Sequence, residues 1–288
     1  MEILKLAVPN KGRLSERIYD LLNRAGLNFQ TKGERVLQVN TKDGNYSVIF
    51  LRTQDIPSFV EKGVADIGFT GFDIVTETET DVDKIMDLDF GNCEMVVAVK
   101  EEDEYQTVSD LPDKFKVATS FPNITKKFFA KIGKTAEITE VTGATEITPR
   151  LGLSDVVVDI TSSGATLKSN KLKIIGSILK SSAVVIARRD LPEELKEKTG
   201  ILIMALQSVL DAEEKKYLMA HVPKKSLEKV KEFLPGLSSP TVTQLLDDTE
   251  NVVIHVVVDK DKIYDSIYKL KQLGGKGILI MTVDQMVR

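Results

Sequence analysis

The strongest constraint on this chain is the alternation of short apolar runs with helical patterns over its first two thirds. Residues 4–8 form a strand-like run, a Pro-Asn-Lys-Gly turn follows at 9–12, and a helical pattern comes next. In that pattern apolar residues recur at i, i+3, i+4 and i+7, Ser15 stands where a cap is expected, and Gly26 can close the end. Such alternation predicts an α/β fold in which helices cover the sheets.

Further strand-like runs continue this pattern and are rich in β-branched residues. They lie at 46–51, 65–69, 95–100, 115–119, 136–140, 155–160, 173–178 and 183–187. Two short helices are predicted between them, at 56–62, with Asp55 as cap and Pro57 in the first turn, and at 123–133. The charged stretch at 100–104 is typical of a solvated loop.

The last quarter of the chain predicts a separate module. A helical pattern runs from about 191 to 216, which places a domain boundary near 212–216. Six elements then follow in the order βαββαβ: strand 217–222, helix 224–234, strands 239–246 and 251–258, helix 260–273 and strand 277–283. Each helix has one apolar face, so both can cover one side of a four-stranded, ferredoxin-like sheet.

Composition excludes several classes of protein. Hydrophobic residues make up 42% of the chain, and no run approaches the roughly 20 apolar residues of a membrane span. The first nine residues lack a basic leader, so a cytoplasmic protein is expected. A single cysteine, Cys93, precludes an intramolecular disulfide, and His221 and His255 are too few for a Cys/His zinc cluster. The net charge of -4 argues against a nucleic-acid binder, so any phosphate site must be local.

The segment 146–167 carries the clearest chemical pattern. A buried Val-Val-Val strand leads into a loop of small and hydroxyl-bearing residues: Thr161, Ser162, Ser163, Gly164 and Thr166. Hydroxyls and unobstructed backbone N–H groups suit a phosphate. Asp155 and Asp159 are expected to flank the loop, where they could accept hydrogen bonds from ribose hydroxyls or orient hydrated magnesium. The alternative is a Ser/Gly surface turn that caps a helix.

Four charged residues are further candidates. Lys11 and Arg13 stand between a strand and a helix N-terminus, where cations and N–H groups could neutralise a polyphosphate. Arg52 directly follows an apolar strand, and a structural salt bridge with Asp55 or Asp73 is its alternative role. Glu146 and the two N-terminal cations could equally be ordinary surface charges.

The spacing of Glu146, Gly152, Asp159, Gly164 and Thr166 resembles the signature of ATP phosphoribosyltransferases, without departure from it. The likeness extends to residues 9–15 (PNKGRLS), 52–57 (RTQDIP), 66–73 (DIGFTGFD) and 118–123 (ATSFPN), and residues 234–241 (LPGLSSPT) resemble the regulatory domain of the long form. The resemblance therefore spans essentially the whole chain.

The resemblance implies a role for each candidate residue. Phosphoribosyl pyrophosphate is expected at Asp155, Asp159, Thr161, Ser162, Ser163, Gly164, Ala165 and Thr166. ATP is expected at Lys11, Arg13, Arg52, Gly71 and Asp73, and the catalytic residues are expected to be Lys11, Arg13, Arg52 and Glu146. Histidine, the expected feedback inhibitor, is expected to bind near His221, Thr241 and Gly277.

The resemblance also implies the reaction and the architecture. ATP and phosphoribosyl pyrophosphate would give N1-(5-phosphoribosyl)-ATP and pyrophosphate, the first step of histidine biosynthesis, with Mg²⁺ bound through substrate phosphates. The expected fold is a bilobal region like type II periplasmic binding proteins at 1–213, with lobe one at about 1–92 and 182–213 and lobe two at about 93–181. A ferredoxin-like regulatory domain at 214–288 and a homo-oligomer, from dimer to hexamer, complete this expectation.

Two alternatives of other classes stay open. A solute-binding or effector-sensing protein could use the same bilobal fold, because fold alone does not assign function. A phosphoribosyl-binding regulator that has lost activity is the other alternative. A phosphate-type loop counts against the first, and the C-terminal module favours the self-sufficient enzyme over the second.

Overall fold

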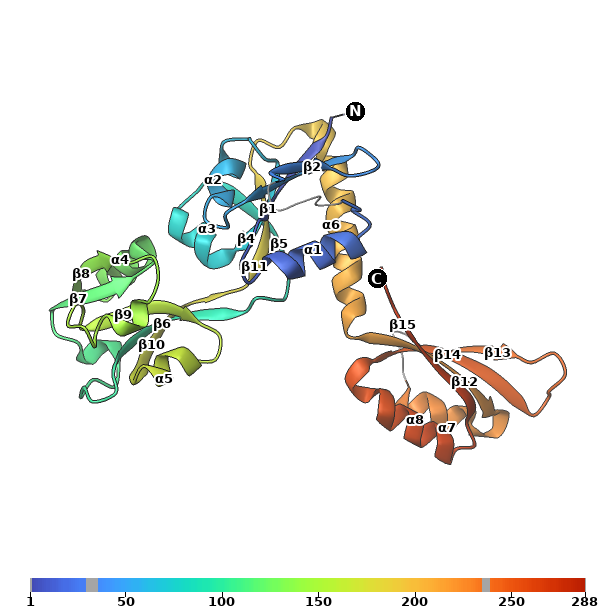
Figure 1. Cartoon of the computed structure of the whole chain (residues 1–288). Coiled ribbons are helices and arrows are strands. Elements are labelled where there is room, and N and C mark those ends of the chain that lie inside the picture. The colour runs from blue at the N-terminus through green and yellow to red at the C-terminus, as the bar shows by residue number, and fades with distance from the viewer. Residues whose placement is uncertain (1, 30–35, 235–238, 288) are drawn as a thin grey trace. The chain divides into compact units, whose positions relative to one another are not determined.

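The computed structural model describes residues 2–29, 36–234 and 239–287 (Figure 1). Two compact units emerge, one from residues 1–20 and 28–199 and the other from residues 21–27 and 200–288. Within the described ranges, no helix is long and apolar enough to cross a membrane.

The first sheet of the first unit has six strands in the order β2-β3-β1-β4-β11-β5. They are β1 (Leu4–Pro9), β2 (Gln38–Asn40), β3 (Tyr46–Leu51), β4 (Ile67–Gly71), β5 (Val82–Asp87) and β11 (Ala183–Arg188). Strand β1 runs parallel to β3 and β4, and helix α2 (Ile56–Glu61) packs on β1, β4 and β11. The carboxyl ends of β1, β3 and β4 therefore meet at one edge of this sheet.

The second sheet has five strands in the order β10-β6-β9-β7-β8. They are β6 (Cys93–Lys100), β7 (Lys114–Thr119), β8 (Thr135–Glu140), β9 (Val156–Thr161) and β10 (Leu172–Ser181). Helix α4 (Pro122–Lys131) packs against β8, and the short α5 (Ala165–Ser169) packs against β10. A core around Val117, Phe129 and Val158 holds this second lobe together.

The chain passes between the two sheets twice, from β5 to β6 through residues 88–92 and from β10 to β11 at residue 182. The predicted bilobal α/β fold is confirmed. Helix α3 (Phe72–Thr78) and strand β5 were not predicted. The reason is their polarity: the one buried residue of α3 is an aspartate, and β5 buries a single residue, so neither shows a clear apolar period.

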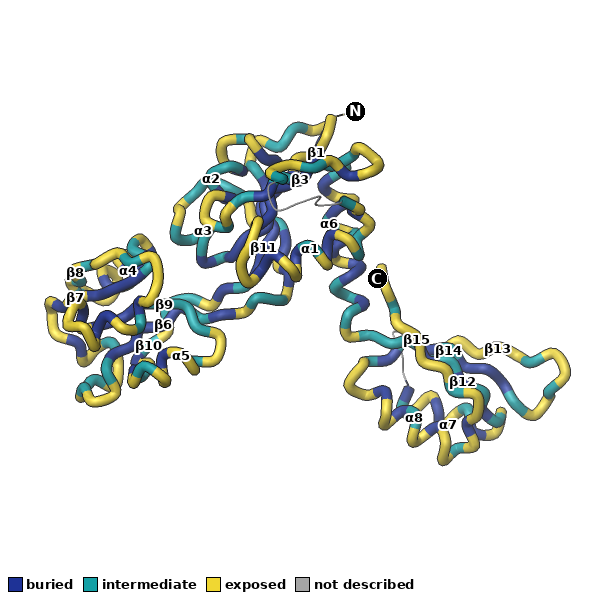
Figure 2. The backbone as a smooth tube through the Cα atoms, viewed as in Figure 1, coloured by how far each residue is buried: buried dark blue, intermediate teal, exposed yellow. Residues whose placement is uncertain are grey.

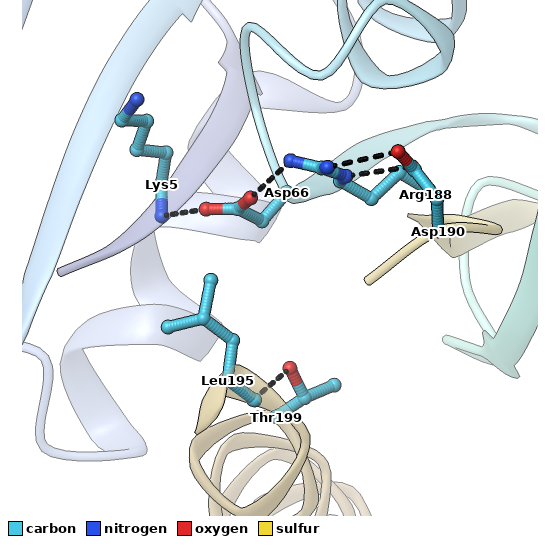
Figure 3. A network of polar contacts seen from close by, with 6 residues as sticks. All are labelled: Lys5, Asp66, Arg188, Asp190, Leu195 and Thr199. Atoms are coloured by element: carbon cyan, nitrogen blue, oxygen red, sulfur yellow. Dashed lines mark hydrogen bonds and ion pairs between the residues drawn. The ribbon is translucent and has the colours of Figure 1, made fainter. Parts of the chain in front are cut away.

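The network in Figure 3 joins β1, β4 and β11 at the edge opposite the carboxyl ends of β1 and β4. Asp66 is 4% exposed, accepts the Lys5 N–H at 2.9 Å through Oδ2 and pairs with Arg188 Nη1 at 3.3 Å through Oδ1. Arg188 also pairs with the exposed Asp190 at 2.8 Å. Asp66 thus has a structural role within its motif, because it fixes where β4 begins.

The second unit contains the predicted βαββαβ module. Its elements are β12 (Lys215–Pro223), α7 (Leu227–Phe233), β13 (Thr241–Gln244), β14 (Asn251–Asp259), α8 (Ile263–Gln272) and β15 (Lys276–Thr282), with strand order β13-β14-β12-β15. Buried residues concentrate on the two central strands, β12 and β14, where Leu218, Ala220 and Ile254 are fully buried, whereas β13 and β15 are largely exposed (Figure 2). Residues 235–238 of the regulatory-domain motif lie outside the described residues.

Two further helices complete the fold, α1 (Ser15–Arg24) and the long α6 (Glu193–Glu213). Ile18, Leu21 and Leu22 of α1 are buried, as their spacing predicts. The Ser15 hydroxyl donates to the Gly12 carbonyl at 2.8 Å. Gly26 adopts a φ of 94° just after the helix end, a conformation that favours glycine.

Candidate functional site

Two loops meet at the carboxyl edge of the first sheet. Asn10 N–H donates to the Leu51 carbonyl at 2.7 Å, which ties the loop after β1 to the end of β3. A pocket of about 510 Å³ opens there, lined by Asn10, Lys11, Gly12, Arg52, Thr53 and Gln54. Gly12 has a φ of 100°, so the tight turn that presents Lys11 favours glycine. The structure thus brings Lys11 and Arg52 together because their strands are parallel neighbours.

The hydroxyl-rich loop follows β9, as the sequence predicts. Gly164 N–H donates to the Thr161 hydroxyl at 2.8 Å, and Ala165 N–H lies 3.4 Å from the Ser163 hydroxyl oxygen. Gly164 has a φ of 72°, and Thr166 follows in the first turn of α5. This bonding fits the alternative of a hydroxyl-capped turn as well as the phosphate loop.

A pocket beside the loop distinguishes it from an ordinary turn. The pocket measures about 510 Å³ and is lined by Asn92, Cys93, Glu94, Thr161, Ser162, Ser163, Gly164, Ile174, Lys180 and Ser181. Four hydroxyl-bearing residues and the exposed Lys180 line this space, beside a single carboxylate, Glu94. That combination favours an anionic ligand.

Arg13 links the two lobes at this pocket. Its Nη1 donates to the Ser162 hydroxyl oxygen at 3.3 Å, and its Nη2 lies 3.2 Å from Cys93 Sγ. Both partners are neutral, so the guanidinium contacts them without forming an ion pair. Because guanidinium binds phosphate oxygens in a bidentate manner, this position suits a phosphorylated ligand.

Two carboxylates stand next to the loop. Burial raises the pKa of Asp159, and the nearby charge of Glu146 raises it further. Two hydrogen bonds oppose this rise and lower the pKa: one from the Ile160 N–H, at 2.7 Å, and one from the Thr145 side chain. The structure therefore brings Asp159 and Glu146 close enough to influence each other.

Asp155 does not join them. It precedes the first residue of β9, whereas the loop follows the last, and six strand residues span about 20 Å. Its carboxylate accepts the Lys116 N–H at 2.9 Å at the start of β7. The expectation that Asp155 flanks the loop is wrong, because the strand separates it from the loop by its whole length.

Gly71 and Asp73 form part of the junction between the lobes. Asp73 is 5% exposed, and its Oδ1 accepts the Ser181 hydroxyl at 2.7 Å while its N–H donates to the same hydroxyl oxygen at 2.9 Å. A Cβ on residue 71 would lie 2.3 Å from Asp73 Oδ1, so glycine leaves room for that carboxylate. The structure thus turns Asp73 towards the end of β10, and its contact with ATP stays a prediction.

Sequence reasoning missed Lys180 and Glu94. They are cross-strand partners on β10 and β6, and Glu94 also pairs with Thr161 on β9, so all three side chains belong to one row of the sheet. Glu94 accepts a hydrogen bond from the Ser177 hydroxyl. The polar triplet at 180–182, which ends an apolar strand, was the available signal, but its neighbours depend on a register that the sequence does not reveal.

Within residues 2–29, 36–234 and 239–287, no group of three or more His, Cys, Asp or Glu side chains could hold a metal ion.

The second unit has its own pocket, on the sheet face opposite the helices. It measures about 470 Å³ and is lined by Tyr217, Ser239, Thr241, Thr243, His255, Val256 and Val257. The Tyr217 hydroxyl lies 2.9 Å from His255 Nδ1, and Thr241 is the cross-strand partner of His255. Tyr217 and His255 were not predicted, because only the β13–β14 register places them beside Thr241.

His221 and Gly277 lie across β14 from Thr241, on β12 and β15. A Cβ on Gly277 would lie 3.7 Å from the His221 ring, which is ordinary van der Waals contact. The structure therefore brings His221 and Gly277 together, whereas Thr241 lines the pocket with Tyr217 and His255. A histidine site at these three residues stays a prediction.

Comparisons with known proteins give a consistent result. A family model described as "ATP phosphoribosyltransferase" matches residues 52–208, and one described as "HisG, C-terminal domain" matches residues 212–285. The chain is 42% identical to an ATP phosphoribosyltransferase of Methanocaldococcus jannaschii over 99% of this chain and 100% of that protein. It is also 42% identical to one of Gemmatimonas aurantiaca, again over 99% and 100%.

Two solved structures resemble the fold. The ATP phosphoribosyl transferase (HisG:HisZ) complex from Thermotoga maritima matches 73% of this chain and 99% of that chain, with 32% identity and a TM-score of 0.65. A structure of Tv2483 bound to L-arginine matches 73% of this chain and 85% of that chain, with a TM-score of 0.50. At 14% identity the second likeness concerns the fold alone.

Proposed function

Because the chain belongs to the ATP phosphoribosyltransferase family, and is therefore a pentosyltransferase of histidine biosynthesis, we propose the reaction that it catalyses. The adenine N1 of ATP attacks C1 of phosphoribosyl pyrophosphate. A bond forms between N1 and C1, the bond from C1 to the pyrophosphate oxygen breaks, and its electron pair leaves with pyrophosphate. The product is N1-(5-phosphoribosyl)-ATP.

One observation carries this assignment within the site: Arg13 of the first lobe contacts Ser162 in the hydroxyl-rich loop of the second. The loop can hold the 5-phosphate through hydroxyls and backbone N–H groups at 161–166. Lys11 and Arg52 line the neighbouring pocket, where they can bind the triphosphate of ATP. Two anionic substrates would thus meet between first-lobe loops that supply cations and a second-lobe loop that supplies hydroxyl groups.

Catalysis would rest on alignment and electrostatics, without a protein nucleophile. Cations near the pyrophosphate stabilise the charge that grows on it, and carboxylates tolerate the positive charge that develops at C1. We propose Asp159 and Glu146 for the second role, and Asp159 could also accept hydrogen bonds from ribose hydroxyls. Magnesium is proposed to arrive bound to the substrate phosphates, whose charge it partly neutralises.

Histidine inhibition is the regulatory part of the proposal. The ferredoxin-like unit offers a partly exposed imidazole at His221 beside Gly277 and a pocket at Thr241. A ligand on this unit that alters catalysis in the other requires coupling between separate sites. We further propose a homo-oligomer, from dimer to hexamer, and a cytoplasmic location.

The test follows the near-ultraviolet absorbance of the N1-ribosylated product. Protein, ATP, phosphoribosyl pyrophosphate and magnesium are mixed with pyrophosphatase, with and without histidine. A signal that needs both substrates and falls with histidine supports the whole proposal. A signal insensitive to histidine refutes the regulatory part alone, and no signal, together with binding of an amino acid but not ATP, refutes the enzyme in favour of a binding protein.

A further inference from the structure

The two lobes of the first unit touch at a second place, away from Arg13. Helix α4 of the second lobe starts at Pro122, and its N-cap residue, Phe121, makes no side-chain capping bond. The first N–H groups of a helix need acceptors from outside the helix. In α4 these acceptors come from the other lobe.

Glu77, in the last turn of α3, supplies them. Its Oε1 accepts the Asn123 N–H at 2.9 Å, and its Oε2 accepts the Ile124 N–H at 3.0 Å. The Asn123 side-chain amide donates in turn to the Glu77 backbone carbonyl at 2.9 Å. A carboxylate at a helix N-terminus also interacts favourably with the helix dipole, so this contact is both bidentate and charge-assisted.

The surroundings of Glu77 make the contact more than a surface ion pair. Glu77 is half-buried, and burial raises its pKa against the lowering effect of the two N–H donors. The nearby pair between Glu79 and Lys127, at 3.0 Å, is exposed at both side chains, 45% and 68%. Exposed pairs of that kind contribute little, so Glu77 carries most of the contact.

Helix α3 is therefore held at both of its ends by the second lobe. Its first turn is bonded through Asp73 to Ser181, at the end of β10, and its last turn is bonded through Glu77 to α4. Helix α4 follows β7, the parallel neighbour of β9, and β9 ends in the phosphate-type loop. Any rotation of the second lobe about the two crossings must move the start of α4 relative to Glu77.

We propose that Glu77 is a positioning residue, whose cap on α4 sets the angle between the lobes at which Arg13 faces the loop at 161–166. It touches no substrate and acts through the placement of that loop. The inference rests on the proposed function only for its kinetic consequence, since the interlobe angle can be measured without activity.

The experiment compares Glu77→Ala with the matched control Glu79→Ala, which removes the exposed pair two residues away. Amide hydrogen exchange of a peptide covering 121–131 reports the cap. Electron-spin distance measurements between labels at Lys62→Cys and Glu137→Cys, exposed positions on the two lobes, report the angle, with Cys93→Ser as the common background. Michaelis constants for both substrates are measured without labels.

We expect Glu77→Ala to speed exchange at the start of α4 by about tenfold, which is the effect of losing a helix cap. We expect it to broaden the interlobe distances and to raise the KM for phosphoribosyl pyrophosphate by up to about tenfold, because only a fraction of molecules then holds the competent angle. Glu79→Ala should leave the exchange rate, the interlobe distances and the KM unchanged. Glu77→Gln keeps one acceptor oxygen, so it should give intermediate values and serves if the alanine variant does not fold.

Faster exchange with unchanged interlobe distances would overturn the proposal, because the cap would then stabilise only its own helix. An equal rise of KM in both variants would also overturn it. If the wild-type protein shows no activity, the proposed function fails, and the distance measurement still decides the role of Glu77.

Discussion

Replacing Arg13 should slow the reaction far more than it destabilises the protein. Arg13 is exposed, and its contacts, the Ser162 hydroxyl and the Cys93 thiol, are neutral groups, so Arg13→Ala should change the unfolding free energy by no more than about 0.5 kcal/mol. A charge-assisted hydrogen bond to phosphate contributes about 1.5–3 kcal/mol. The corresponding loss in kcat/KM for phosphoribosyl pyrophosphate is roughly 10- to 150-fold.

Most of that loss should fall on kcat, because the negative charge on pyrophosphate grows as the bond to C1 breaks. The assay is the product absorbance with each substrate varied in turn. Arg13→Lys keeps the charge but not the planar fork, so it should recover only part of the rate. Arg189→Ala is the matched control, since this arginine is 61% exposed and pairs with surface carboxylates.

Unchanged kinetics in Arg13→Ala would remove this residue from the site. A rise in KM with kcat unchanged would instead assign Arg13 to ground-state binding alone. If Arg13→Ala lowers the unfolding free energy by as many kcal/mol as it raises the activation free energy, the contacts with Ser162 and Cys93 serve the fold. That result would contradict the expectation that these contacts contribute little to stability.

Three further predictions concern carboxylates. Asp66→Asn keeps an acceptor for the Lys5 N–H but removes the buried charge beside Arg188, so the unfolding free energy measured with denaturant should fall by about 1.5–3 kcal/mol. The KM values should stay unchanged, because this network lies at the edge of the sheet opposite the site. Asp159 has a raised pKa and should act ionised, so kcat/KM should fall on acidification at a pH above the usual range of aspartate, and Asp159→Asn should abolish that limb of the pH profile. Asp259 pairs with Lys215 and Lys262, which lower its pKa to about 2; its stabilisation is present above pH about 4 and is lost as the pH falls through about 2. Because Asp259 is 38% exposed, Asp259→Asn should cost only about 0.5–1 kcal/mol at neutral pH, as measured by thermal unfolding at several pH values.

The sequence predicts most of the fold where apolar residues recur with a clear period. Strand β9 reads as three consecutive valines, all fully buried, and the helix after β1 shows its apolar face directly. Prediction fails at α3 and β5, which are short and largely polar. Helix α3 is positioned by the junction between lobes, in which Asp73 bonds to Ser181 over 108 residues of sequence, and β5 by its antiparallel pairing with β11. A local pattern contains no trace of such a contact.

The candidate site shows the same division. Loops that follow parallel strands must meet at one edge, so the proximity of Lys11 and Arg52 could be expected from strand order alone. The placement of Asp155 could not be expected from the spacing of the motif. Asp155 and Asp159 are only four residues apart, but the extended strand between them puts Asp155 at the opposite edge of the sheet from the loop. Lys180 reaches the pocket beside the loop at 161–166 only through an antiparallel register between β10 and β6.

Polar groups at the two ends of α3 explain why its own sequence identifies it so poorly. Its buried carboxylate, Asp73, and its half-buried one, Glu77, would each be unfavourable in an isolated helix packed on a sheet. Each accepts hydrogen bonds from donors on the second lobe, the Ser181 hydroxyl for Asp73 and the first N–H groups of α4 for Glu77. The helix is therefore stable where it is because the lobes are joined. The same bonds that make α3 hard to predict are the ones that can fix the angle between Arg13 and the loop that it must face.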